Sequence, residues 1–274
     1  MAKYSFKHDI HSVEYLQNPV VVLITGEMYE MVAGVPTLLC ELDEIVKHVV
    51  KENGALYVAT SESIFRVEGS KVERLKRTDL SKITAMCVSQ CGSTVVVGDY
   101  DGKISVLEKD ESYSYQEHEE MIIGLVVKNK TIFSASEDGV VVKTKIGAEE
   151  PTDVYEIPKI LRYIGELFER ITVIDTSGSC YVLDKKVNDF VQHRKVLGKV
   201  SEIFKVDKEV YIEGKENLAK IVTHTETEQL PVNAKRIDGL YREGKEIFPI
   251  RRNKITEWAE EKQPNELKEF FEDL

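Results

Sequence analysis

The sequence predicts an all-β fold: a ring of seven four-stranded antiparallel sheets arranged as the blades of a propeller. Three observations lead to this prediction. A short apolar pattern recurs along the chain, each unit is too short to hold a helix between its strands, and several expected strands are apolar at consecutive positions. The chain has 274 residues, of which 42% are hydrophobic and 31% charged, so it can form a sizeable core. The ring would occupy residues 1–260, and residues 261–274 would form a separate helical tail.

The recurring pattern is an aliphatic residue, two variable residues and a second apolar residue. Its copies begin 36, 37, 39, 38, 40 and 37 residues apart, at Ile10, Val46, Ile83, Ile122, Ile160, Val200 and Ile237. Near-constant spacing of this length is typical of repeat folds, propellers included. We therefore expect seven similar units that fill the chain.

Within each unit the order of the expected elements also repeats. The second apolar runs are expected at 20–24, 56–59, 95–97, 131–133, 171–174, 210–212 and 247–250. Tight turns such as Asp101-Gly102 and Asp138-Gly139 follow, because glycine tolerates the positive φ that short hairpins need. Third strands come next, for example 103–107, and fourth strands close most units, for example 71–76.

The length of a unit decides between a propeller and a barrel. Four strands of ~5–6 residues and four short connections use about 38 residues. No unit then has room for a crossover helix, which excludes a parallel β/α barrel. Runs such as Val140-Val141-Val142 indicate sheets that are covered on both faces, as stacked blades are. The seventh unit ends after its third strand, so residues 3–8 are expected to supply its missing strand.

Residues 83–110, ITAMCVSQCGSTVVVGDYDGKISVLEKD, place Gly-Asp and Asp-Gly between the second and third strands. In KITEW, at 254–258, Trp258 stands where one family of propellers usually has its tryptophan. Both segments resemble WD40 repeats, although the Gly-His dipeptide of that family is absent. The resemblance implies closure of a seven-bladed ring by an N-terminal strand. A rigid β framework without an assembled reactive site predicts a non-catalytic protein-interaction scaffold.

A second resemblance concerns residues 89–146, which contain STVVVGDYDGKIS, EHEEMIIGL and SASEDGVVVKTK in that order. This stretch is similar to the non-catalytic WD40 subunit of the tRNA (guanine-N7) methyltransferase. The matching positions are Asp99, Gly102, His118, Met121 and Asp138. Tyr100 and Glu137 depart from the lysine and arginine of that family. The resemblance implies a catalytic partner subunit that uses S-adenosylmethionine.

Charge sets the expectations for partners. Lysine and arginine total 37 and aspartate and glutamate 48, giving a net charge of −11, which argues against nucleic-acid binding over the whole surface. An acidic face suits a basic polypeptide such as a ribosomal protein or a histone tail, so a chaperone or assembly factor for a basic ribosomal protein is the alternative. Local contact with RNA or an acidic partner would use two basic clusters. The first consists of Arg74, Lys76 and Arg77, with Lys82 nearby, and the second consists of Arg251 and Arg252.

The remaining candidate residues lie in one connection and in the tail. His118 precedes the fourth unit, where a histidine is expected either to order its loop by hydrogen bonding or to be exposed. In EKQPNELKEFFEDL, at 261–274, the apolar residues have the spacing of one helix face, namely Leu267, Phe270, Phe271 and Leu274. A helix this short is marginal alone, so it would dock on its own ring or on a partner, or remain frayed. His118, Phe270, Phe271 and Leu274 join the residues of the two basic clusters as candidate partner-binding residues.

Catalysis, cofactors and metals are not predicted. No spacing suggests a nucleophile–histidine–acid set, and no glycine-rich phosphate loop precedes a helix. Cys87 and Cys91 lack two further zinc ligands, and residues 99–102 lack most ligands of a calcium loop. The charged N-terminus resembles no signal peptide, and no apolar run is long enough to cross a membrane. We expect a cytoplasmic or nuclear protein with its four cysteines as thiols.

Overall fold

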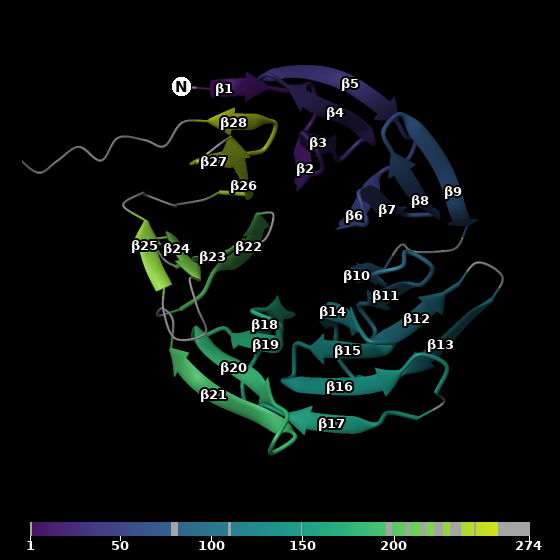
Figure 1. The fold of residues 1–274 in the computed structure, drawn as a ribbon, viewed down its shortest axis with the longest axis vertical. Coiled ribbons are helices and arrows are strands. Elements are labelled where there is room, and N and C mark those ends of the chain that lie inside the picture. The colour runs from purple at the N-terminus through teal and green to yellow at the C-terminus, as the bar shows by residue number, and fades with distance from the viewer. Residues whose placement is uncertain are drawn as a thin grey trace, which may run out of the picture.

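The computed structural model describes residues 2–77, 82–108, 111–148, 150–195, 199–206, 209–214, 218–221, 227–230, 237–243 and 245–256. In these residues the chain forms seven four-stranded antiparallel sheets, which stand around a central axis as the blades of a propeller (Figure 1). The described residues contain no helix. The prediction of an all-β ring with seven blades is therefore confirmed. The predicted tail helix at 261–274 lies outside the described residues.

The first four blades follow the chain without interruption. Blade 1 consists of β2 (Ile10–Tyr15), β3 (Pro19–Leu23), β4 (Glu27–Val32) and β5 (Val35–Glu41). Blade 2 consists of β6 (Val46–Glu52), β7 (Ala55–Thr60), β8 (Ser63–Glu68) and β9 (Lys71–Arg77). Blade 3 consists of β10 (Ile83–Val88), β11 (Val95–Asp99), β12 (Lys103–Leu107) and β13 (Ser112–Gln116). Blade 4 consists of β14 (Ile122–Lys128), β15 (Thr131–Ser136), β16 (Val140–Lys145) and β17 (Asp153–Glu156).

The last three blades complete the circle. Blade 5 consists of β18 (Leu161–Leu167), β19 (Arg170–Asp175), β20 (Ser179–Asp184) and β21 (Asp189–Lys195). Blade 6 consists of β22 (Glu202–Val206), β23 (Glu209–Glu213), β24 (Leu218–Ile221) and β25 (Thr227–Leu230). Blade 7 consists of β26 (Gly239–Glu243), β27 (Glu246–Arg251), β28 (Lys254–Thr256) and, from the other end of the chain, β1 (Ala2–Ser5).

Pairing of the N-terminal strand with blade 7 closes the ring. β1 runs antiparallel to β28, with Tyr4 opposite Ile255 and Ser5 opposite Lys254. The backbone N–H of Phe6 then donates to the carbonyl of Asn253 at 2.8 Å. The predicted closing strand at 3–8 is thus confirmed, although the regular strand is shorter.

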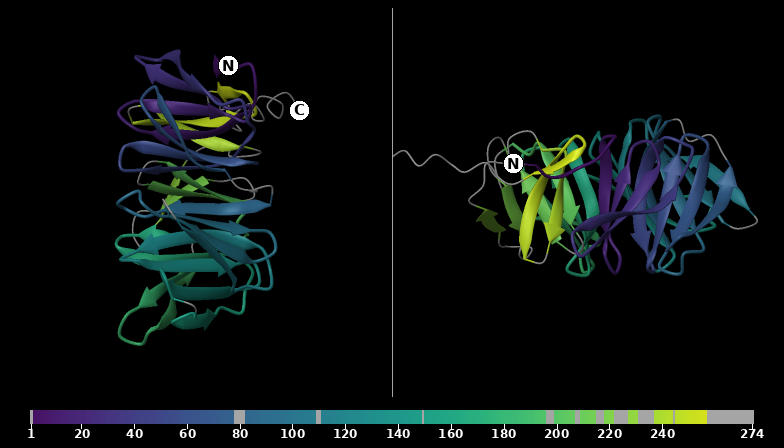
Figure 2. Two further views of the ribbon diagram at one scale, coloured as in Figure 1. Left: turned by 90° about the vertical axis from the view of Figure 1, so that its right-hand side faces the viewer. Right: turned by 90° about the horizontal axis from the view of Figure 1, so that it is seen from above.

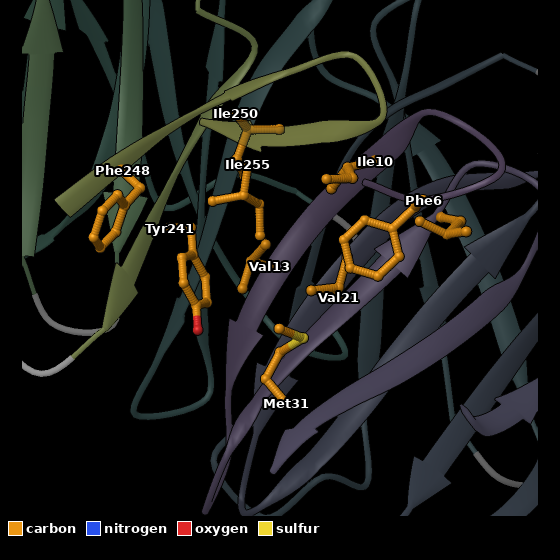
Figure 3. Close-up of a cluster of buried hydrophobic side chains, with 10 residues drawn as sticks. Phe6, Ile10, Val13, Val21, Met31, Tyr241, Phe248, Ile250 and Ile255 are labelled. Atoms are coloured by element: carbon orange, nitrogen blue, oxygen red, sulfur yellow. The ribbon is translucent and has the colours of Figure 1, made fainter. Parts of the chain in front are cut away.

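The hydrophobic core is divided into slices between neighbouring blades. At the seam between blades 7 and 1, side chains of both blades pack against one another (Figure 3), namely Phe6, Ile10, Val13, Val21, Leu23, Met31, Tyr241, Phe248, Ile250 and Ile255. Other junctions follow the same plan; Tyr155 of blade 4, for example, belongs to one buried cluster with Ile164 and Val173 of blade 5. Because a blade is covered on both faces, successive residues such as Val141 and Val142 are both buried.

The innermost strands share a feature that the sequence pattern did not predict. In each of blades 1–5, the first strand has a β-bulge directly after its first residue, where its pairing with the second strand shifts by one position. The extra residues in these bulges are His11, Lys47, Thr84, Ile123 and Arg162. Such bulges redirect a side chain. His11 Nε2 lies 3.1 Å from the carbonyl of Lys47 in blade 2, and Thr84 Oγ1 donates to the carbonyl of Ile122 in blade 4 at 2.7 Å. The bulges therefore help to join neighbouring blades.

Candidate functional site

The ring has two ends with different loops (Figure 2). Because the strands of each blade are antiparallel, the turns between second and third strands lie at the same end as the connections between blades. We call this end the turn rim. The opposite end carries the turns between first and second and between third and fourth strands, and we call it the hairpin rim.

A repeated backbone hydrogen-bond pattern makes the turn rim rigid. The residue after a second strand donates its N–H to the residue before the first strand of the same blade, as Glu137 does to Met121 at 3.0 Å. The carbonyl of Glu137 then accepts from Leu161, which begins blade 5, at 3.3 Å. Blade 5 repeats both links through Thr176. These bonds fix each turn relative to the next blade.

The turns themselves are held by aspartates at matching positions. Asp99 Oδ1 accepts from the N–H groups of Asp101 and Lys103 at 3.0 and 2.9 Å. Asp175 is buried, and its Oδ1 accepts from the N–H groups of Ser177 and Ser179 at 2.8 Å each. An aspartate at the end of the second strand therefore holds the turn in both blades, which agrees with the hairpin interpretation of residues 99–102.

His118 lies beneath the turn rim rather than on its surface. Its side chain is 3% exposed, and Nε2 lies 2.8 Å from Ser134 Oγ, whereas Nδ1 has no partner. Burial lowers the pKa of His118 to about 4, so the imidazole is neutral at pH 7. The neighbouring Glu117 accepts from Thr144 Oγ1 at 2.6 Å, and burial raises its pKa. This placement supports the loop-ordering role that the sequence allowed.

The first predicted basic cluster lies at the junction of blades 2 and 3, and carboxylates surround it. Arg74 Nη2 lies 3.2 Å from Glu44 Oε1, and Arg77 Nη2 lies 3.3 Å from Glu62 Oε2. The nearby Lys82 is 2.5 Å from Asp101, and Lys76 is half-buried. These ion pairs reduce the positive potential that a phosphate backbone would meet.

The second predicted basic cluster lies at the same end of the ring, in the turn between β27 and β28. Arg251 Nη1 donates to Thr256 Oγ1 at 3.0 Å. Arg252 is exposed and has a left-handed backbone with φ of 53°, and its N–H donates to Asp238 Oδ2 at 2.6 Å. Blade 1 separates this turn from the first cluster. The structure thus brings both clusters to one rim but does not join them into one basic patch.

Sequence reasoning missed an apolar component of the turn rim. Four large side chains stand exposed in its turns and connections, with 42–64% of their surface accessible, namely Ile24, Ile45, Tyr100 and Ile160. Carboxylates lie in the same turns and connections, including Asp43, Glu44, Asp101, Glu119, Glu120, Glu137 and Asp138. We call these residues together the acidic–apolar surface. The sequence held one sign of this surface, because Tyr100 is a large aromatic residue between two aspartates of a turn, Asp99 and Asp101.

Some predicted features are not described by the structure. Phe270, Phe271, Leu274 and Trp258 lie outside the described residues. Among the described residues, no group of three histidine, cysteine or acidic side chains is placed to hold a metal ion. In the same part of the chain, no helix has the length and apolar character needed to cross a membrane.

Comparisons with known proteins address the fold. No protein-family model matches the sequence, and no relative is found among curated proteins. The computationally designed Ika8 protein matches with a TM-score of 0.69 at 16% identity, over 94% of this chain and 89% of that one. The WD40 β-propeller domain of Doa1 matches with a TM-score of 0.68 at 13% identity, over 95% of this chain and 97% of that one. Neither match supports the resemblance to the tRNA methyltransferase subunit. At these identities the matches establish the fold, and the chain is a WD40-like β-propeller.

Proposed function

We propose that this chain is a non-catalytic protein-interaction scaffold whose acidic–apolar surface binds a basic, partly apolar segment of another protein. WD40 propeller folds commonly serve as protein-interaction scaffolds and are typically non-catalytic. The observation that carries the proposal is the presence of four exposed large apolar side chains among carboxylates on a hydrogen-bonded rim.

The two components of this surface have different roles in binding. Glu44 and Asp101 already pair with Arg74 and Lys82, so the other carboxylates of this surface, on a chain with a net charge of −11, would attract a basic segment and raise its association rate. Burial of the exposed part of each apolar side chain would contribute about 1 kcal/mol, and Tyr100 suits the centre of such a contact. Because the turns are already ordered, little entropy is lost on this side of the complex.

The same surface favours a polypeptide over RNA. Arg74, Arg77 and Lys82 already pair with carboxylates, and an RNA phosphate would have to displace those partners. A chaperone or assembly factor for a basic ribosomal protein is the specific form of scaffold that this charge supports. The methyltransferase-subunit alternative depends on the sequence motif alone. Both partners would place the protein in the cytoplasm or nucleus.

The test is binding of the full chain to a labelled synthetic peptide rich in arginine, lysine and leucine, followed by fluorescence anisotropy. Tyr100→Ser and Ile160→Ser should each weaken binding about fivefold, since each removes about 1 kcal/mol of apolar contact. Val187→Ser is the matched control, because Val187 is equally exposed but lies on the hairpin rim. Affinity should also fall with rising salt.

Two results would contradict the proposal. One is equal affinity of wild type and both rim variants for the peptide. The other is tighter binding of single-stranded RNA that depends on Arg74 and Arg77, which would favour the RNA alternative.

A further inference from the structure

A cavity opens on the hairpin rim at the seam between blades 7 and 1. Its volume is about 310 Å³, and it is lined by Tyr15, Pro19, Met31, Ala33, Gly34, Tyr241, Arg242 and Glu243. Met31 and Tyr241, which face one another across the seam in Figure 3, are buried in the core. Most of the lining is apolar, and the volume is that of a small binding pocket.

Exposed valines adjoin this cavity. Ala33 and Gly34 form the tip of the β4–β5 hairpin, and Val32 and Val35 pair directly across it. Val32 is 45% and Val35 61% exposed, and the first half of β5 is exposed as well. An apolar hairpin beside a cavity on an edge strand is a site that proteins usually cover.

The end of the described chain lies next to this site. Thr256 is opposite Ala2, and Ile255 is opposite Tyr4. Tyr4 Oη donates to Glu243 Oε1 in the cavity wall at 3.2 Å, and a Cβ on Gly34 would lie 3.1 Å from Tyr4 Oη. Residues 257–274 therefore continue from β28, and the strand paired with it, β1, carries the Tyr4 that contacts Glu243 and lies beside Gly34 in the cavity wall.

We propose that residues 265–274 of this same chain bind the cavity as an amphipathic helix. Phe270 and Phe271 would fill the cavity mouth, and Leu267 and Leu274 would cover Val32 and Val35. Residues 257–264 can span about 27 Å when extended, and a ten-residue helix adds about 15 Å, so the segment can reach the site. A tethered segment has an effective concentration in the millimolar range, which favours it over a second copy or a separate partner.

Hydrogen exchange of the full-length protein, read by mass spectrometry, tests this binding. In the wild type, the amides of residues 265–274 should exchange about tenfold more slowly than in Val35→Glu, because a charge on the hairpin opposes helix docking. Val154→Glu is the matched control: Val154 is 56% exposed, also lies on an outer strand, and belongs to blade 4. This control should retain the slow exchange. Fast exchange in the wild type, or equal slowing in Val35→Glu, would overturn the proposal.

Disulfide trapping provides a second measurement in a Cys91→Ser background. The pair Val35→Cys and Phe271→Cys should form an intramolecular disulfide, whereas the pair Val154→Cys and Phe271→Cys should not. A disulfide between two chains, or exchange protection that disappears on dilution, would assign the site to a second copy and reject the intrachain contact. None of these substitutions touches the turn rim, so this proposal and the proposed function can fail separately.

Discussion

Acid should weaken the fold partly through His118, and replacement of this residue by glutamine should remove that part. The imidazole is buried against Ser134, and burial lowers its pKa from the ordinary 6.5 to about 4. Between these two pH values the unfolded chain binds a proton that the folded chain excludes. Stability from this group is therefore complete above pH 6.5 and falls as the pH drops toward 4.

The size of the effect follows from the two pKa values. Each step of one pH unit between 6.5 and 4 shifts the free energy of unfolding by about 1.4 kcal/mol, giving a total on the order of 3 kcal/mol. Glutamine stays neutral and can still bond to Ser134. The stability difference between wild type and His118→Gln should thus shift by that amount in favour of the variant between pH 7 and pH 4.

Urea unfolding at several pH values, followed by circular dichroism, measures this difference. His11 and His48 also have pKa values lowered by burial, but they titrate in both proteins and cancel in the comparison. His193→Gln is the matched control for replacing a histidine at an exposed position, here on β21. A difference between wild type and His118→Gln that does not change with pH would refute the reasoning.

Three further predictions concern stability and thiol chemistry. Gly102→Ala should lower the free energy of unfolding in urea by about 3 kcal/mol, because φ is +80° and the new Cβ would overlap the carbonyl of His118. Gly54→Ala is the control and should lower it by about 1 kcal/mol, because φ is +73° but the space around Gly54 is open. Equal losses in the two variants would contradict the overlap. Phe6→Ala should cost about 3 kcal/mol in the same assay, since Phe6 is buried at the seam; a loss below about 1 kcal/mol would contradict its role in closure. Hydrogen bonds from Ser89 and Ser93 lower the pKa of Cys91 to about 7. The rate of alkylation of exposed Cys91 by iodoacetamide should therefore have its midpoint near pH 7, and buried Cys87 should remain unmodified. A midpoint above pH 8 would contradict the lowered pKa of Cys91.

The blade count and most strand positions were predictable because both depend on local pattern. The expected third strand at 103–107 coincides with β12, and the expected second run at 171–174 lies within β19. Apolar residues in a blade are buried whichever blade comes next, so their spacing is enough to locate the strands. The closing strand was predictable because the seventh unit lacked one.

The chemistry of the turn rim was less predictable because it depends on ion pairs between residues that are distant in the sequence. Glu44 pairs with Arg74 from 30 residues away, and Glu62 pairs with Arg77 from the same blade. Ile160 marked the start of a repeat and read as a strand residue, yet it is exposed just before β18. Sequence spacing locates a residue along its strand, but only the assembled ring shows which strand ends reach the surface.

The seam between blades 7 and 1 connects the proposed tail site to the stability of the ring. Within the described chain, this junction joins residues from opposite ends of the sequence, so no short connection holds it closed. A segment that binds only the closed seam must stabilise closure by its own binding free energy. Val35→Glu should therefore lower the urea midpoint of the full chain, although Val35 is exposed, whereas Val154→Glu should leave it unchanged. Equal midpoints for the two variants would show that the segment, wherever it binds, does not contribute to closing the ring.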